Sequence, residues 1–384
     1  MKLLAGYLLA ASLAISPVTF PGLVQQDPEN PSKSFQVAKG GDLDVDVDPG
    51  SVQIEPWDKN EVFIQAENVD ADSPDRLKMS QSGNTVTLKY RSRRRYDNND
   101  VRFTINVPMQ FNAHIVTSGG SVEQRDKLTG TFFVDTKGGS VHMDEIVGNV
   151  RVESGGGSIH GETIDGDANV RTGGGSVTIR TTTGKAEVSS GGGSLRLDKV
   201  GKGLTLSTGG GSVDVGDVAI GADIHTGGGS VKVGKVKQSL KITTGGGGVQ
   251  VHGASGDISV RTGGGSVTME DIVGTIALKT GGGDISVELT PDGKGGSTIY
   301  SGGGDIRFSI PADAKANIEA TLNLRHGWGD RWKKYKITSD FKAGKYENDE
   351  DADAKFASYA LNGGGDKIEL ETTNGNIEIR KLTK

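Results

Sequence analysis

Two histidines and two carboxylates recur at matching places in this sequence and could bind a metal ion. His142 and His160 stand at the same place in successive copies of a repeated segment, and each is followed two residues later by a carboxylate, Asp144 or Glu162. In a β-strand, residues two apart share a face, so each imidazole would lie beside a carboxylate. Such pairs can ligate a divalent metal, but no residues around them would enclose a site or supply a second shell. We keep the four as weak metal candidates and expect instead a solvated row of polar side chains.

The segment Gly-Gly-Gly-Ser occurs many times and could suggest phosphate or calcium binding. A phosphate loop needs a following Lys and a helix, whereas a strand residue follows here, as Val177 follows Ser176. A calcium β-roll places Asp at the sixth position of a glycine-rich nonapeptide, where this chain has Val, Ile or Leu. Aspartate replaces the serine only in the last units, as at Asp284 and Asp305. We therefore predict no catalytic residue, no cofactor and no metal.

A short basic run could contact an anionic polysaccharide. Four arginines stand between two tyrosines and are followed by two aspartates: Tyr90, Arg91, Arg93, Arg94, Arg95, Tyr96, Asp97 and Asp100. A charged loop that joins two strands is the simpler interpretation, and the polysaccharide contact stays open as the alternative.

An 18-residue repeat makes up the middle of the chain and must position all of these residues. Each unit opens with Thr or Ser, usually followed by the glycine segment and an apolar residue. The opening residues are evenly spaced: Thr136, Ser154, Thr172, Ser190, Thr208, Thr226, Thr244, Thr262 and Thr280. Thr117 precedes the series and Ser301 follows it, each at a slightly longer spacing.

Apolar residues recur at fixed positions when the opening residue of each unit is counted as position 1. Positions 6, 8, 11, 15 and 17 are nearly always apolar, with Gly161 the one exception at position 8. Apolar pairs spaced by two indicate β-strands rather than helices, and the glycines at positions 2–4 and often 13 let the chain reverse. Positions 7, 9, 16 and 18 vary among polar residues, so we predict that they face solvent.

One unit has too few apolar residues to bury them alone, so neighbouring units should stack. We predict an all-β fold, a parallel β-helix or β-solenoid, with 18-residue coils that rise by ~4.8 Å each; the repeat alone does not fix its handedness. An antiparallel sandwich also has short strands at regular spacing, but it gives no reason for the same period to hold eight times.

The repeats divide the chain into four expected parts. They are a signal peptide (1–22), N-terminal β-coils and cap (35–116), regular glycine-rich repeats (117–310), and C-terminal coils with an aromatic-rich cap insertion (311–384). The insertion, residues 328–359, includes Trp328 and Tyr359. A cap over the last coil is favoured because an open sheet edge needs cover, and a sugar- or peptide-stacking surface is the alternative.

Composition and the N-terminus indicate an exported protein. Lys2 and the short apolar run at residues 3–14 are typical of a secretory signal, and no other stretch is long enough to span a membrane. The chain has no Cys, which excludes disulfides and thiol chemistry, and its net charge of −6 does not suit nucleic acid. We expect a periplasmic, cell-surface or extracellular protein without an integral membrane span after signal cleavage.

Three stretches of the chain resemble one bacterial family. They are residues 50–57 with 60–64, residues 101–108 with 116–122, and residues 361–380. In these stretches the chain is similar to the putative-adhesin family of exported β-strand-repeat proteins, a domain of unknown function. The resemblance implies a right-handed β-helix and offers no catalytic residues. The long regular middle and the Trp-rich insertion depart from the family pattern.

Three functions follow from this interpretation. The first is a non-enzymatic exported protein that presents a repetitive surface for binding or adhesion to a protein or polysaccharide of the cell envelope. The second is a structural envelope protein that self-associates end to end through its open tips. The third is a carbohydrate-active β-helix enzyme, which would need long loops around a cleft, whereas the units carry no insertions.

Overall fold

The computed structural model describes residues 30–69, 76–92, 101–324, 335–349 and 353–382. In these residues the named elements are 33 β-strands, all in one hydrogen-bonded sheet. No helix in them is long and apolar enough to cross a membrane. The predicted signal peptide lies outside the described residues, so its expectation stays a prediction.

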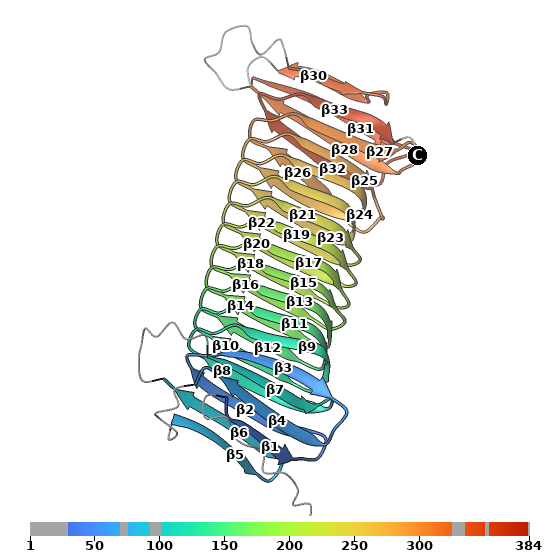
Figure 1. Ribbon diagram of the computed structural model, residues 1–384. Helices are drawn as coiled ribbons and strands as arrows, with labels where there is room; N and C mark the ends of the chain where they lie inside the picture. The colour runs from blue at the N-terminus through green and yellow to red at the C-terminus, as the bar shows by residue number, and fades with distance from the viewer. Residues whose placement is uncertain (1–29, 70–75, 93–100, 325–334, 350–352, 383–384) are drawn as a thin grey trace, which may run out of the picture.

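The strands of the middle region form two rows that face each other across one apolar core (Figure 1). The first row contains β9 (Val122–Thr129), β11 (Val141–Val147), β13 (Ile159–Asp165), β15 (Val177–Thr182), β17 (Leu195–Val200), β19 (Val213–Val218), β21 (Val231–Val236), β25 (Ile285–Thr290) and β27 (Ile306–Pro311). The second row contains β8 (Phe111–Thr117), β10 (Phe132–Thr136), β12 (Val150–Ser154), β14 (Ala168–Thr172), β16 (Ala186–Ser190), β18 (Leu204–Thr208), β20 (Gly221–Thr226), β22 (Ser239–Thr244) and β26 (Ser297–Ser301). Two longer strands, β23 (Val249–Thr262) and β24 (Val267–Thr280), run through both rows.

Additional strands complete the rows at both ends of the molecule. At the N-terminal end these are β1 (Ser32–Gln36), β2 (Gly41–Asp48), β3 (Ser51–Trp57), β4 (Glu61–Glu67), β5 (Leu77–Ser82), β6 (Thr85–Arg91) and β7 (Arg102–Pro108). At the C-terminal end they are β28 (Ala316–Asn323), β29 (Ile337–Ser339), β30 (Lys345–Asp349), β31 (Ala354–Leu361), β32 (Asp366–Thr373) and β33 (Ile377–Leu382).

The predicted fold, a right-handed parallel β-helix or β-solenoid of 18-residue coils, is wrong as a description of this chain. Strand orientation is mixed: β1–β4, β4–β7, β5–β6, β28–β31 and β30–β31 are antiparallel pairs. The 18-residue step also fails toward the C-terminus, where Ser301 pairs with Thr372. The strands instead form one continuous, nearly closed, barrel-like wall of mixed orientation around the core. The regular repeats do not reveal this, because the reversals lie in the irregular ends, where the chain folds back to cover exposed sheet edges.

Within the wall, equivalent residues of successive repeat units still lie beside one another. Val213 pairs with Val231 in the first row, and Leu204 pairs with Ala222 in the second, both between parallel strands. The predicted inward positions are confirmed in the described units: Val213 and Ile224, at positions 6 and 17, are 1% and 0% exposed. Burial of these aliphatic side chains is the main stabilising contribution to the wall.

The opening Thr or Ser of each unit also lies in the core, which the sequence analysis did not predict. Thr208 is buried, and its Oγ1 donates a hydrogen bond to the carbonyl oxygen of Gly193 in the preceding unit at 2.7 Å. The same oxygen accepts from the backbone N–H of Gly211 in its own turn at 3.4 Å. Equivalent bonds recur along the repeats, so a line of hydroxyls satisfies backbone groups that would otherwise be buried without partners.

The glycine segments stack in the same way, and their three glycines are not equivalent. At Gly191 and Gly193 an added Cβ would lie closer than 3.0 Å to backbone atoms of the preceding unit, whereas at Gly192 it would meet nothing within 4 Å. The outer two glycines therefore permit the close approach of neighbouring turns, and the middle one faces open space.

At the N-terminal end, side chains bridge the two outermost strands. Lys33 Nζ on β1 donates to the carbonyl oxygen of Met79 on β5 at 2.9 Å, and Gln81 Nε2 on β5 donates to that of Gln36 on β1 at 2.7 Å. These contacts occupy backbone acceptors of strands that each pair with one other strand in the described part of the chain. Such protection reduces edge-to-edge pairing with another molecule.

At the C-terminal end, several aromatic residues of the predicted insertion cover the core. Tyr359 is buried, and Tyr335 and Phe341 are partly buried against the core. Tyr346 and Phe356 of the same insertion are exposed, so the cap and the stacking surface both stay predictions. Trp328 and Trp332 lie outside the described residues.

Candidate functional site

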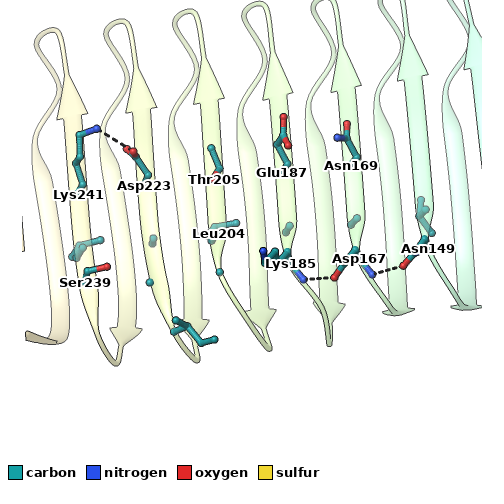
Figure 2. A pocket seen from close by; sticks show the side chains of 18 of the residues that line it. Asn149, Asp167, Asn169, Lys185, Glu187, Leu204, Thr205, Asp223, Ser239 and Lys241 are labelled. Carbon is teal, nitrogen blue, oxygen red and sulfur yellow. Dashed lines mark hydrogen bonds and ion pairs between the residues drawn. The ribbon is translucent and has the colours of Figure 1, made fainter.

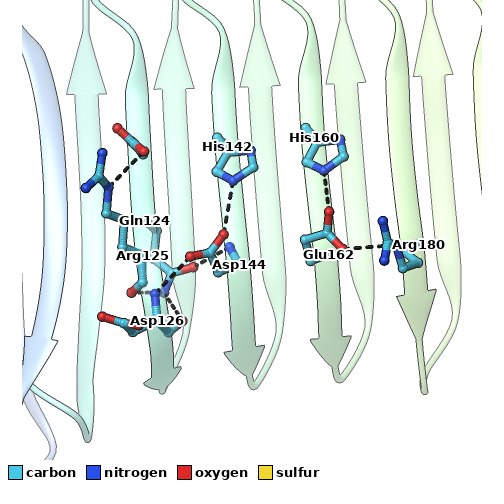
Figure 3. Close-up of polar contacts among 9 residues, drawn as sticks. Gln124, Arg125, Asp126, His142, Asp144, His160, Glu162 and Arg180 are labelled. Carbon is cyan, nitrogen blue, oxygen red and sulfur yellow. Dashed lines mark hydrogen bonds and ion pairs between the residues drawn. The ribbon is translucent and has the colours of Figure 1, made fainter.

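The four metal candidates lie in neighbouring strands, β11 and β13, on the outer face of the first row (Figure 3). The imidazole rings of His142 and His160 are stacked, with centroids 5.0 Å apart and planes at 1°. His142 Nε2 lies 3.0 Å from Asp144 Oδ1, and His160 Nε2 lies 2.8 Å from Glu162 Oε1. Each histidine is thus paired with the carboxylate two residues along its own strand.

The carboxylates of this cluster are already occupied by other groups. Glu162 Oε2 forms an ion pair with Arg180 Nε at 3.0 Å, and Asp144 Oδ2 accepts the backbone N–H of Asp126 at 3.0 Å. The hydrogen bond from His160, followed by the charge of Arg180, lowers the pKa of Glu162. Within the described ranges, no three His, Asp or Glu side chains are grouped closely enough to hold a metal ion. The cluster has the geometry of an exposed row of ion pairs.

The basic run is only partly described. Arg91 Nη1 donates to the carbonyl oxygen of Asp46 at 3.0 Å and pairs with the Asp46 carboxylate. Arg93, Arg94 and Arg95 lie outside the described residues, so the polysaccharide contact predicted as their alternative role stays a prediction.

A long groove lies on the outer face of the second row (Figure 2). Its volume is about 1180 Å³. It crosses the strands, because equivalent residues of nine successive units line it. One wall is formed by Thr131 and, at position 14 of the next eight units, by Asn149, Asp167, Lys185, Gly203, Gly221, Ser239, Asp257 and Thr275. The other is formed by Phe133 and, at position 16 of the same eight units, by Arg151, Asn169, Glu187, Thr205, Asp223, Lys241, Ser259 and Ala277.

The alternation of side chains in the second row produces this arrangement. Position 15 points into the core, as the buried Leu204 and Ala222 show, while positions 14 and 16 point outward on either side. The backbone at position 15 therefore forms the floor between two walls. Because strands are spaced by ~4.8 Å, the nine units give a groove roughly 40 Å long.

The four acidic side chains of the groove all have partners. Asp167 Oδ1 accepts the backbone N–H of Lys185 at 2.8 Å. Asp223 Oδ2 lies 3.0 Å from Lys241 Nζ, as Figure 2 shows. The other two pairs are Glu187 with Arg171 Nη2 at 3.0 Å and Asp257 with Thr275 Oγ1 at 3.0 Å. Such engaged carboxylates serve to fix the walls.

The centre of the groove differs from its ends. Gly203 and Gly221 leave the first wall without side chains in two successive units. A Cβ added at Gly203 would have its nearest neighbour, the carbonyl oxygen of Gly221, 3.9 Å away, so the space above this residue is open. Ile220, which is 40% exposed, adds an aliphatic side chain beside them. The centre is therefore wider and more apolar than the flanks.

One end of the groove contains its aromatic residue. Phe133 is half-buried, and the ring of His114 lies 4.6 Å from it, centroid to centroid. The guanidinium of Arg151 lies 5.8 Å from the Phe133 centroid, at cation–π distance. These neighbours in adjacent strands flank the ring.

The sequence analysis predicted that position 16 faces solvent but did not predict a groove. One signal was available: position 14 loses its side chain at Gly203 and Gly221 while an isoleucine, Ile220, stands in the adjacent turn. The metal candidates, by contrast, lie on the other row, away from the groove residues.

Comparison with known proteins gives structural neighbours only. No family model matches the chain, and no curated protein matches it. Similar solved structures include a putative cell adhesion protein from Clostridium sporogenes (10% identity, 92% of this chain and 100% of that one, TM-score 0.18). Another is a putative adhesin from Bacteroides fragilis (11% identity, 94% and 100%, TM-score 0.19). A third is a putative lipid binding protein from Parabacteroides distasonis (16% identity, 74% and 98%, TM-score 0.23).

These neighbours include bacterial proteins named as putative adhesins, in agreement with the family that the three sequence stretches resemble. The chain is similar to them, but identities of 10–16% and TM-scores of 0.18–0.23 transfer neither a site nor a partner.

Proposed function

We propose that this chain is a non-enzymatic, exported binding protein that uses the groove of the second row to hold an elongated component of the cell envelope in an adhesive role. The observation that carries the proposal is the groove itself, which presents the same two wall positions through nine units. A concave surface of this kind suits a long partner better than a compact one, since each unit adds an equivalent contact.

The groove chemistry supports binding over catalysis. Acid–base catalysis needs a carboxyl or imidazole group free to exchange a proton with the substrate. Asp167, Glu187, Asp223 and Asp257 are instead bonded to a backbone N–H, a guanidinium, an ammonium and a hydroxyl. The carbohydrate-active enzyme is thus the weaker alternative.

The self-assembling structural protein is also the weaker alternative. End-to-end association would use unpaired strand edges at the tips. Contacts such as Lys33 to Met79 occupy the edge acceptors of β1 and β5, and the outer strand β30 carries the charged residues Lys345 and Glu347. Charges on an edge strand oppose pairing with a second molecule.

Co-sedimentation of the chain lacking residues 1–22 with isolated bacterial envelope material tests the proposal. Replacing Thr205 with arginine places a large charged side chain in the groove, and Thr178→Arg places the same side chain on the opposite row at position 7. Wild type and Thr178→Arg should sediment with the envelope, and Thr205→Arg should remain in the supernatant. Equal sedimentation of all three would overturn the groove as the binding surface, and release of envelope fragments by the wild type would overturn the non-enzymatic assignment.

A further inference from the structure

We infer that the ligand of the groove is an uncharged polysaccharide chain that lies along the groove axis, with about one sugar for each 18-residue unit. This inference rests on the proposed function and names its ligand class. Four observations carry it: the direction and period of the groove, its charge balance, its free polar groups and its apolar centre.

The direction and period of the groove favour a sugar chain over a peptide. The groove crosses the strands, so its equivalent positions recur at the strand spacing of ~4.8 Å. An extended peptide that adds to a sheet runs parallel to the strands and needs a free edge. A peptide laid across them would repeat its side-chain directions every ~6.6 Å as a strand, or every ~9 Å as polyproline II, out of step with the units. A chain of equatorially linked pyranoses advances by nearly the strand spacing per sugar.

The charge of the groove argues against an ionic polymer. Its lining includes three basic residues, Arg151, Lys185 and Lys241, and four acidic ones. The acidic side chains are already paired, and basic and acidic residues are interspersed along both walls. Binding of a polyanion or polycation depends on a surface of one sign of charge, which this groove does not provide.

Several polar side chains of the groove remain available to a ligand. Asn169, Thr205 and Ser239 line it, and in the described part of the chain no side-chain hydrogen bond fixes their direction, whereas Ser259 Oγ accepts from Arg261 Nη1 at 3.2 Å. Amide and hydroxyl groups both donate and accept, as sugar hydroxyls do. Asn169, Thr205 and Ser239 occur in three different units, two units apart along the groove, so every second sugar would meet a partner.

The centre of the groove fits the apolar face of a sugar ring. The space at Gly203 is open, whereas Ser239 Oγ would lie 2.6 Å from a Cβ added at Gly221, and Ile220 offers an exposed aliphatic surface. A pyranose ring has a face of C–H groups that gains from burial against such a surface. This section should therefore contribute most to affinity, while the polar flanks fix the orientation of the chain.

Calorimetric titration with defined uncharged oligosaccharides tests the inference. The probes are β-1,4-linked glucose and N-acetylglucosamine oligomers of about three to about twelve sugars, matched to the groove length. At least one series should bind, with affinity that rises with length and becomes constant near nine sugars, the number of units that line the groove. Affinity that is constant from the shortest oligomer onward would overturn the alignment of the chain along the groove.

A glycine pair provides matched variants. Gly203→Arg fills the open centre, whereas Gly192→Arg places the same residue in the open space of the triglycine turn of the same unit. Gly203→Arg should weaken the oligosaccharide affinity by about tenfold or more, and Gly192→Arg should leave it unchanged. If Gly203→Arg does not fold, Asn169→Ala against Thr178→Ala gives the same comparison with smaller side chains.

The outcomes separate the ligand class from the proposed function. Groove-dependent binding to envelope material without binding to any uncharged oligosaccharide would overturn the ligand class and leave the binding role intact. Groove-dependent binding of polygalacturonate, or of phosphatidylglycerol vesicles, in place of uncharged oligomers would overturn it as well. Equal affinity of Gly203→Arg and Gly192→Arg would overturn the groove as the sugar site.

Discussion

Replacing Gly193 with alanine should strongly destabilise the wall, although it adds only one methyl group. The new Cβ would lie closer than 3.0 Å to the carbonyl carbon and oxygen of Gly175 and to the backbone nitrogen of Ser176. These atoms belong to the backbone of the preceding unit and cannot rotate away as a flexible side chain could. Relief requires the two units to separate, which would also stretch the bond from Ser190 Oγ to the carbonyl oxygen of Gly175.

The cost combines overpacking with a weakened buried hydrogen bond. Overpacking of a tight contact costs about 1–3 kcal/mol, and a buried acceptor left without its donor costs about 1–3 kcal/mol more. We therefore expect the free energy of unfolding to fall by roughly 3 kcal/mol or more.

The middle glycine of the same segment is the matched control. A Cβ at Gly192 meets nothing within 4 Å, and this residue has no left-handed φ that would disfavour alanine. Gly192→Ala restricts the unfolded chain and should stabilise by about 0.4–1 kcal/mol. Urea unfolding followed by circular dichroism measures both variants under one condition. Equal effects of the two substitutions would refute the stacking of triglycine turns on which the account of the wall depends.

Two further predictions concern a buried hydroxyl and an exposed carboxylate. Thr208→Val removes the donor to the carbonyl oxygen of Gly193 and should lower the free energy of unfolding by about 1–3 kcal/mol. The control is Thr205→Val, at an exposed position on the same strand, which should change the free energy of unfolding by less than about 0.5 kcal/mol. A similar loss of stability in both variants would contradict the role of the buried hydroxyl. His160→Ala removes the main cause of the lowered pKa of Glu162, so NMR titration of that carboxyl should show its pKa rising, and an unmoved pKa would disprove the pairing. Because this pKa is lowered in the folded state, the contribution of Glu162 to stability is present above the ordinary glutamate pKa and is lost as the pH falls through the folded value.

Apolar spacing predicted the interior of the wall but not its overall architecture. Positions such as Val213 and Ile224 are buried as expected, because alternation within a strand alone decides which side chains share a face. The mixed strand orientation was missed. The antiparallel strands β28 and β31 lie where the repeat stops, and nothing in the periodic units encodes how the chain reverses there. The buried line of hydroxyls was also missed, because Thr208 was counted only as a marker of the repeat.

The four candidate residues lie on an outer face, where each histidine pairs with the carboxylate on its own strand. The expectation that they hold no metal stays a prediction. His142 and His160 stack in neighbouring strands, as their equivalent places in successive units require. Spacing alone could not show that the carboxylate of Glu162 also pairs with Arg180 in the next unit. The groove was missed because its walls depend on how the outward side chains at positions 14 and 16 of separate units line up in space, which hydrophobic periodicity does not encode.

The stacked repeats indicate which positions of the sequence can carry residues selected for function rather than for folding. Packing restricts which residue types can stand at the inward positions and at the outer glycines. The residues found there therefore reflect the fold and carry little information about a ligand. Outward positions are free of that restriction, so an apolar residue or a glycine at an outward position needs a cause other than packing. Ile220 exposes an apolar side chain in a turn, where burial does not reward it, and Gly203 is a glycine at a place where a side chain would fit. Both departures lie in the centre of the groove. Neither is required by the wall, and together they leave an open space and an exposed aliphatic side chain in the groove. This is the physical basis for expecting the bound chain to be held there.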